Sequence, residues 1–321
     1  MTRLRTAIMA CLATLACGDA PRPVMPDGVA FHVLPLSISE ADTDRLGPLR
    51  LRGAMAMQSR NESFGSYSGL HVSDDGTRLT AIGWGSWFVA RLAHGSAGNL
   101  TGVELDGVFP LRDAAGRPIT DDADKDAESL VEREGTYYVG FETNSRVARY
   151  RGIEAAAEPV DLPPDDLASI PKCCGFSSVV FTARHELLAL TEGARDSAGR
   201  VKGWLWQNGR AEPLWLRGER RWLPVDIALL PDGDLLLVEV HEDLWTERWH
   251  SRFSRIAAAE VQPGGNMAAE PLGELYSADH PERIEGIHVR TGSSGETLVY
   301  AISDSRRGWP TTLLMFELKN Q

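Results

Sequence analysis

Acidic side chains recur at the ends of short apolar runs in this chain, and such groups could bind a cation or move a proton. Six carboxylates stand at these positions: Glu128, Glu142, Asp226, Glu239, Glu285 and Asp304. Carboxylates that lie together repel one another, and burial strengthens the repulsion unless a cation, a proton or hydrogen bonds compensate. Three roles are therefore open: hard oxygen ligands without clustered His or Cys favour Ca²⁺, a pair with raised pKa values could serve as general acid and base, and carboxylates that accept backbone N–H groups could simply hold neighbouring elements together.

The acidic residues belong to a repeat that occurs five times. In each copy a small or acidic residue opens an apolar run, a turn follows, and a second apolar run ends near a polar residue. The anchors lie at intervals of 60, 49, 49 and 59 residues; they are Ser68, Glu128, Ser177, Asp226 and Glu285. A unit that cannot bury its own apolar face must stack against copies of itself, and this period is typical of one four-stranded propeller blade with its loops.

The repeat predicts an all-β fold with a single β-propeller of five four-stranded blades; a degenerate sixth blade stays open. The final unit has three strand-like runs, the last being TTLLMFELK, and the run LRLRGAMAM from Leu49 could supply its fourth strand. This pairing of the beginning of the chain with its end would close the ring and leave few exposed strand edges. The run VAFHVLPLSI from Val29 would be an extra strand. In the third unit, Asn208 and Gly209 predict a hairpin of two outer strands.

Hairpin geometry predicts where the polar anchors meet. The start of the first strand and the end of the second lie at the same end of an antiparallel pair. Each opening anchor should therefore neighbour a closing residue: Glu128 with Glu142, Ser177 with Glu192, Asp226 with Glu239, Glu285 with Asp304, and Ser68 with the turn at Trp84. In a propeller these points gather at one mouth of the central channel, so we expect an acidic ring there.

Basic residues follow several of these anchors along the chain. Arg146 comes four residues after Glu142, Arg306 comes two residues after Asp304, and Lys202 opens the outer hairpin of the third unit. Together with a bound cation they could bind the phosphate of an anionic substrate. The alternative is that they are solvated loop charges.

The segments DAESLVEREGTYYVGFETNSRVARY, VDIALLPDGDLLLVE, IEGIHVRTGSSGETLVYAISD and TTLLMFEL resemble the phytase-like propeller family, which is described by the esterase-like activity of the phytase family. The resemblance extends over about residues 59–318. It implies an exported propeller grouped with calcium-dependent phosphate-ester hydrolases. The positions carried over individually are Asp126, Glu128, Glu142, Arg146, Glu192, Asp226, Glu239, Glu285 and Asp304.

Two positions depart from the family pattern. The third unit opens with Ser177 where the pattern favours an acidic residue, and the first closes at Trp84 where it favours an aspartate. These changes weaken a site for several cations more than they weaken the fold.

The first residues indicate export. Arg3 and Arg5 precede an apolar stretch that is too short to span a bilayer, so residues 1–18 are interpreted as a signal peptide. Cys17 could alternatively be acylated as a lipoprotein anchor. Residues 19–28 would then form a Pro-rich linker and residues 29–321 the propeller domain, in a periplasmic or secreted protein, membrane-anchored if Cys17 carries a lipid.

The net charge limits the partners. Removal of the leader takes away two positive charges and changes the formal net charge from −12 to −14. Such a protein should repel nucleic acid. We expect a monomer that acts on a small anionic substrate or ligand.

Only Cys173 and Cys174 certainly remain after processing, and they are adjacent. They are either two free thiols in a loop between blades or, in an oxidising compartment, a strained vicinal disulfide.

The leading hypothesis is a Ca²⁺-dependent hydrolase of phosphate or related esters, with its site at the channel mouth. Glu128, Asp226 and Glu285 would be catalytic; Glu128, Glu142, Asp226, Glu239, Glu285 and Asp304 would be metal ligands; Arg146, Arg306 and Lys202 would bind the substrate. The competing hypothesis is a non-catalytic envelope propeller that serves as a ligand-binding or interaction module.

Overall fold

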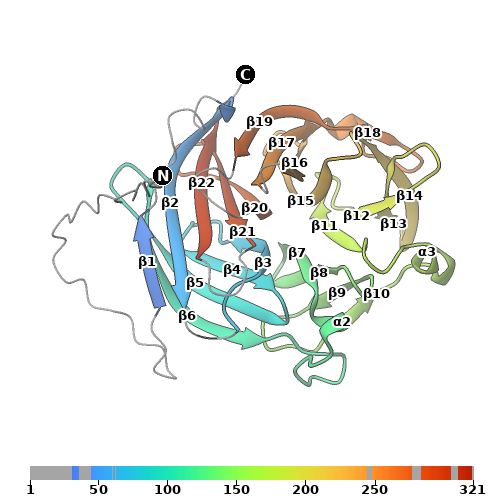
Figure 1. The fold of residues 1–321 in the computed structure, drawn as a ribbon, viewed down its shortest axis with the longest axis horizontal. Helices are drawn as coiled ribbons and strands as arrows, with labels where there is room; N and C mark the ends of the chain where they lie inside the picture. The colour runs from blue at the N-terminus through green and yellow to red at the C-terminus, as the bar shows by residue number, and fades with distance from the viewer. Residues whose placement is uncertain are drawn as a thin grey trace, which may run out of the picture.

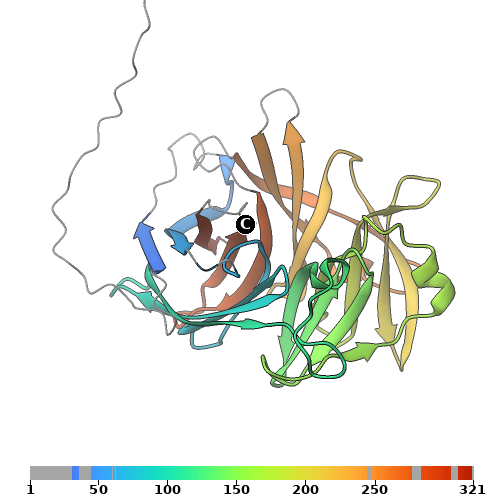
Figure 2. The same cartoon turned by 60° about the horizontal axis from the view of Figure 1, so that its bottom comes forward.

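The computed structural model describes residues 31–35, 45–59, 61, 63–243, 248–276, 283–304 and 310–319. In this part the chain forms a ring of five sheets, each built around four antiparallel strands (Figure 1). In the turned view the sheets stand as separate twisted layers around the ring (Figure 2). The predicted five-bladed β-propeller is confirmed. None of the helices described is long and apolar enough to cross a membrane.

The first two blades each consist of four consecutive strands. They are β3 (Tyr67–Val72), β4 (Arg78–Gly83), β5 (Ser86–His94) and β6 (Leu100–Pro110), followed by β7 (Ala127–Arg133), β8 (Thr136–Phe141), β9 (Arg146–Tyr150) and β10 (Glu158–Val160).

The third blade takes one strand from later in the chain. It consists of β11 (Phe176–Phe181), β12 (Leu187–Arg195), β13 (Val201–Gln207) and β14 (Arg210–Arg217), with the short strand β18 (Asn266–Ala268) parallel to β14. The fourth blade consists of β15 (Leu223–Leu229), β16 (Leu235–Asp243), β17 (Arg248–Ile256) and β19 (Glu270–Tyr276). The expected hairpin joins β13 to β14, and both turn residues have positive φ, 50° for Asn208 and 76° for Gly209.

The fifth blade joins the two ends of the chain. Its strands are β20 (Ile284–Thr291), β21 (Thr297–Ser303), β22 (Thr311–Leu318), β2 (Leu49–Ser59) and β1 (Phe31–Pro35). β2 pairs antiparallel with β22, so that Leu49 lies opposite Leu318 and Met57 opposite Thr311. The predicted ring closure and the extra strand at β1 are both confirmed.

Short helical segments interrupt the sheets in the described part of the chain. The helix α2 (Asp122–Lys125) precedes β7, the helix α3 (Pro164–Ala168) precedes β11, and the 3₁₀ turn η1 (Ala258–Glu260) precedes β18. The side chain of Asp121 caps α2 by accepting a hydrogen bond of 3.0 Å from the Ala123 N–H.

The first strand of every blade lies nearest the centre of the ring, and each of these strands carries a β-bulge near its beginning. A bulge inserts one unpaired residue and re-aims its side chain. The bulged residues are Ser68, Glu128, Ser177, Val225 and Glu285. Four of the five predicted anchors occupy this position.

The fourth anchor is displaced by one residue. Val225 is the bulged residue of β15, and Asp226 follows it opposite Val238 of β16. The prediction that Asp226 is equivalent to Glu128 and Glu285 is therefore wrong, and the side chains of the fourth blade reach different surroundings.

Candidate functional site

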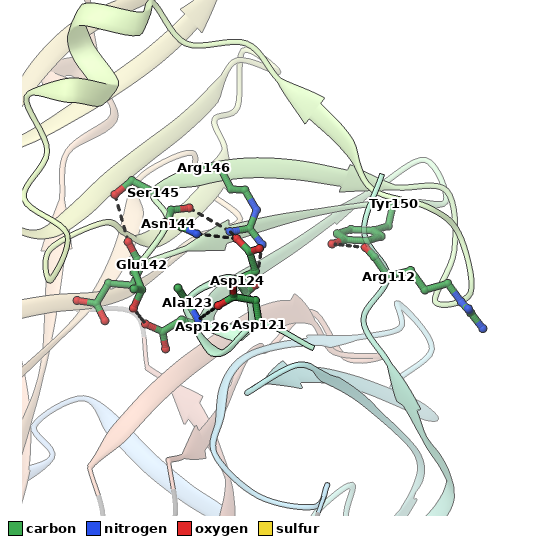
Figure 3. Close-up of polar contacts among 11 residues, drawn as sticks. Arg112, Asp121, Ala123, Asp124, Asp126, Glu142, Asn144, Ser145, Arg146 and Tyr150 are labelled. Atoms are coloured by element: carbon green, nitrogen blue, oxygen red, sulfur yellow. Dashed lines mark hydrogen bonds and ion pairs between the residues drawn. The ribbon is translucent and has the colours of Figure 1, made fainter. Parts of the chain in front are cut away.

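Three carboxylates converge at the mouth end of the second blade. Oxygen atoms of Asp126, Glu128 and Glu142 all lie within 4.8 Å of one another. The Glu142 N–H donates a hydrogen bond of 2.9 Å to the Asp126 carbonyl, which joins the end of β8 to the beginning of β7 (Figure 3). Two oxygens that bind the same Ca²⁺ at 2.3–2.6 Å are at most about 5 Å apart. The three side chains are therefore close enough to share one hard cation.

Local structure places these groups. The helix α2 ends immediately before Asp126, and the bulge at Glu128 sets this side chain out of the regular alternation of β7. The hydroxyl of Thr143 donates a hydrogen bond to Asp126 Oδ2. Asp126 is thus held by its own blade, while no side-chain hydrogen bond to Glu128 is found among the described residues.

Two other blades contribute acidic groups to the same mouth. In four blades the residue of the second strand or its continuation that follows the last residue paired with the first strand donates its N–H to the residue before the first strand. These donors are Trp84, Glu142, Glu192 and Asp304. The register places Val240 at the equivalent point of the fourth blade. Glu192 shares a side-chain hydrogen bond with Glu142, and Glu285 lies near enough to Glu128 to affect its ionisation.

The cluster holds protons strongly. Burial raises the pKa of Glu142 to about 9, assisted by the hydrogen bond and the repulsion from Glu192 and by repulsion from Asp126. Burial also raises the pKa of Glu128 well above its ordinary value, and the negative charges of Glu285, Asp126 and Glu142 add to the effect. A bound divalent cation would reverse this balance by favouring the ionised forms.

Arg283 is the basic residue that faces the cluster. Its Nε pairs with Glu285 Oε1, and its Nη2 lies 3.9 Å from Asp304 Oδ2. Burial alone would lower the pKa of Arg283, but the charges of Glu285, Asp304 and Glu128 raise it above its ordinary value. Burial raises the pKa of Glu285 to about 8, although Arg283 opposes the shift. A carboxyl with a raised pKa and a fixed positive charge are thus neighbours.

Asp226 lies in a different, fully occupied environment. Its Oδ1 accepts a hydrogen bond of 2.6 Å from the Ser129 hydroxyl, and its Oδ2 accepts one of 2.8 Å from the Ile287 N–H. The Ser129 hydroxyl oxygen in turn accepts a hydrogen bond of 2.8 Å from the Val179 N–H. These residues come from four different inner strands, β15, β7, β20 and β11, so the chain of hydrogen bonds ties four blades together at the centre.

Glu239 is likewise engaged within its own blade. Its Oε2 accepts hydrogen bonds of 3.0 Å from Arg252 Nε and 2.8 Å from the Ser254 hydroxyl. Burial raises the pKa of Glu239, while Arg252 and Ser254 oppose the shift. The offset of one residue that moves Asp226 also places Glu239 opposite Pro224, one step inside the mouth.

The two predicted substrate-binding cations that the structure describes, Arg146 and Lys202, are bonded to groups beside their own strands. Arg146 donates hydrogen bonds of 2.6 Å to the Asp124 carbonyl and 3.0 Å to the Asn144 carbonyl (Figure 3). Its guanidinium also lies 3.6 Å from the centre of the Phe141 ring. Lys202 donates hydrogen bonds of 3.2 Å to the Asp166 carboxylate in α3 and of 3.0 Å to the Ser169 hydroxyl. Arg306 lies outside the described residues.

Trp84 occupies the mouth position that carboxylates fill in three other blades. Its side chain is 48% exposed, and it is the only large exposed hydrophobic side chain in the described part of the chain. The N–H of the next residue, Gly85, donates a hydrogen bond of 2.9 Å to the carbonyl of Lys125, which immediately precedes Asp126. An indole face is therefore available to a ligand beside the acidic cluster.

Sequence reasoning missed one functional candidate and underrated two others. Arg283 was not singled out, although it stands two residues before Glu285 at the point where the repeat opens. Asp126 and Glu192 were carried over by family resemblance, but they were not placed in the predicted ligand set. The hairpin register places position 126 opposite 142 and position 175 opposite 192. This register would have identified both Asp126 and Glu192 as residues of the mouth.

Residues 62–305 match the phytase-like family, whose description is esterase-like activity of phytase. The matched segment covers all five inner strands and every residue of the acidic cluster. A search of the curated proteins finds no match.

Several solved structures are similar to the chain. The endo-arabinase of Bacteroides thetaiotaomicron VPI-5482 is 12% identical with a TM-score of 0.51, and the match covers 80% of this chain and 95% of that one. The PQQ-bound aldose sugar dehydrogenase of Streptomyces coelicolor is 11% identical with a TM-score of 0.43, and the match covers 93% and 100%. The glutaminyl cyclase of Myxococcus xanthus is 14% identical with a TM-score of 0.40, and the match covers 80% and 93%. At these identities the likeness concerns the fold alone.

Proposed function

The chain belongs to the phytase-like family, and from this premise we propose that it is a cation-dependent hydrolase of phosphate or related esters. The active site would be the channel mouth between the second, third and fifth blades. The observation that carries the proposal is the convergence of Asp126, Glu128 and Glu142 within 4.8 Å, beside a second group formed by Glu285, Asp304 and Arg283.

The donor set fits a hard divalent cation such as Ca²⁺. All three converging ligands are carboxylate oxygens, and neither His nor Cys joins them among the described residues. Asp126, Glu128 and Glu142 would hold the ion, with Glu192 next to Glu142. When bound, such an ion polarises an ester or phosphoryl oxygen and lowers the pKa of a coordinated water.

Two residues of the fifth blade would donate a proton and bind the negative charge of the substrate. Burial raises the pKa of Glu285 to about 8, which would suit this carboxyl to give a proton to the leaving oxygen. Arg283 is paired with Glu285 and faces Asp304, and its fixed charge would attract an anionic group of the substrate. Arg283 would add to the predicted substrate-binding residues Arg146, Arg306 and Lys202, whose role stays a prediction.

The decisive experiment measures turnover with and without Ca²⁺. Phytate, an aryl phosphate and an aryl carboxylate ester would be tested in Ca²⁺ and in chelator, with wild type and the Glu128→Gln variant. A matched control is Glu104→Gln, which removes an exposed carboxylate paired with Arg91 on outer strands. We expect Ca²⁺-dependent release of product by wild type and the control, and loss of that activity in Glu128→Gln. Background rates from folded wild type on all three substrates would overturn the proposal.

A non-catalytic binding module is the second candidate. Trp84 and Val240 interrupt the acidic ring, and Asp226 is occupied by hydrogen bonds that join blades. A rise in melting temperature with Ca²⁺, unaccompanied by turnover of any ester, would favour this candidate.

We also propose, from the leader sequence, that the protein is exported and that residues 1–18 are removed. The leader, Cys17 and the linker at residues 19–28 lie outside the described residues. N-terminal sequencing and mass measurement of protein from the cell envelope would distinguish ordinary cleavage from acylation at Cys17.

A further inference from the structure

Two thiols touch each other beside the acidic cluster. Cys173 and Cys174 are free; Cys173 is exposed and Cys174 is partly buried. Their sulfur atoms lie 2.8 Å apart. The pair lies in a turn, in which the Cys174 N–H donates a hydrogen bond of 3.0 Å to the Pro171 carbonyl.

The backbone connects this turn directly to the cluster. Gly175 follows Cys174, and a Cβ on Gly175 would lie only 2.1 Å from the Glu142 carbonyl oxygen. The Gly175 carbonyl accepts a hydrogen bond of 2.9 Å from the Glu192 N–H. Gly175 therefore packs against Glu142 with no spare room, and a shift of the turn must be felt by two carboxylates of the mouth.

We propose that Cys173 and Cys174 are a reversible redox site, and that closing their vicinal disulfide weakens cation binding by the acidic cluster. The first half of this proposal stands on the two sulfurs alone. The second half rests on the proposed cation site.

The oxidation is a balanced exchange with a low-molecular-weight disulfide. The exposed Cys173 thiolate attacks that disulfide, forms a mixed disulfide and releases one thiol. Cys174 then loses its proton to solvent and attacks the Cys173 sulfur, which closes the vicinal bond and releases the second thiol. Two electrons pass from the cysteine pair to the small disulfide, which is reduced to two thiols.

The geometry favours a bond that opens again easily. Neighbouring Cα atoms are about 3.8 Å apart, whereas bridged cysteines usually have Cα atoms about 4.4–6.8 Å apart. Strained or exposed disulfides are the more readily reduced ones. Burial, followed by the hydrogen bond and the charge of Cys173, raises the pKa of Cys174 to about 12, which is consistent with the exposed Cys173 reacting first.

Peptide mapping tests the redox site. The full chain would be equilibrated with a small disulfide, blocked with an alkylating agent, digested with trypsin, and analysed for the peptide 173–184, which carries no other cysteine. We expect this peptide to lose two hydrogen atoms and to regain two alkylatable thiols after reduction. Cys174→Ser should instead retain a mixed disulfide at Cys173, and Cys173→Ser should keep Cys174 as an alkylatable thiol. A wild-type peptide that ends as a mixed disulfide or as an unreacted dithiol overturns the proposal.

Calorimetric titration with Ca²⁺ tests the coupling. We expect the oxidised wild type to bind Ca²⁺ about tenfold more weakly than the reduced form, within the usual range for coupled sites. Oxidant should leave the affinity of Cys173→Ser unchanged. Equal affinities of both wild-type forms refute the coupling. If neither form binds Ca²⁺, the proposed cation site and the coupling both fail, while peptide mapping still decides the redox site.

Discussion

Replacing Asp226 with alanine tests whether this carboxyl joins blades or serves the active site. The substitution removes the acceptor of the Ser129 hydroxyl and of the Ile287 N–H, both buried at the centre of the ring. A buried donor left without a partner costs about 1–3 kcal/mol. Two such donors give about 2–6 kcal/mol of lost stability by the same rule.

The burial of Asp226 itself offsets part of this loss. Burial raises the pKa of Asp226 well above its ordinary value, although the hydrogen bonds from Ser129 and from the Ile287 and Ile227 amides oppose the shift. Removing a carboxyl that is expensive to bury gives back some free energy, so we expect a net loss of about 2–4 kcal/mol. For a domain of this size the melting temperature should fall on the order of 10 °C.

Urea unfolding followed by tryptophan fluorescence, with and without Ca²⁺, measures this loss. Glu104→Gln is the matched control, and an exposed ion pair of this kind contributes at most about 1 kcal/mol. Ser129→Ala is the second variant, because it leaves the Val179 N–H without its acceptor, and it should combine non-additively with Asp226→Ala. A loss no larger than the control's would refute the blade-joining role. Disappearance of the Ca²⁺ response in Asp226→Ala would refute it as well, by making Asp226 a ligand.

Three further predictions concern the mouth. In chelator, stability should fall as the pH rises from about 5 to about 9, because folded Glu142 and Glu285 keep protons that the unfolded chain has already released; their pKa values are about 9 and about 8. Thermal unfolding across this range checks the sign, and Ca²⁺ should flatten the curve. Glu128→Gln should stabilise the protein in chelator by about 1–2 kcal/mol through relief of repulsion and should abolish the Ca²⁺-induced rise in melting temperature; a lower melting temperature in chelator contradicts this. Trp84→Ala should raise KM about tenfold and leave kcat and the melting temperature unchanged, since the exposed indole can contact substrate but supports no core; an unchanged KM places the substrate elsewhere.

The architecture could be predicted from the sequence because its signals are local and repeated. Each blade shows the same succession of apolar run, turn and apolar run, and the turn at Asn208 and Gly209 marks its hairpin without tertiary information. Ring closure was also accessible, because the final unit lacked one strand and the segment from Leu49 could supply it. Because the same pattern occurs five times, a wrong assignment at one position does not change the predicted number of blades. The same error does change the predicted role of the residue at that position.

The site was predicted less completely because it depends on differences of one residue. A strand alternates its faces at every step, so an offset of one position sends a side chain to other surroundings. Aligning the copies by residue type placed Asp226 with Glu128 and Glu285, whereas the bulge of β15 falls at Val225. Arg283 was missed for a related reason. Its importance comes from contacts with Glu285 in β20 and with Asp304, which follows β21 and comes close only when the two strands pair.

The offset in the fourth blade divides the acidic residues into two groups with different chemistry. Asp226 and Glu239 lie one residue further inside the channel than the mouth positions. Their carboxylate oxygens accept hydrogen bonds from serine hydroxyls, an arginine and a backbone amide, so they need no cation. Glu128, Glu142 and Glu192 stay at the mouth, where their nearest polar neighbours include one another, and their mutual repulsion falls only with a proton or a positive charge. A symmetric ring of five equivalent carboxylates would offer no preferred place for an ion. Because Val240 and Trp84 replace the acid in two blades, negative charge is concentrated on one side of the mouth, between the second and third blades and facing Arg283 of the fifth. The asymmetry that weakens the case for several ions therefore strengthens the case for one.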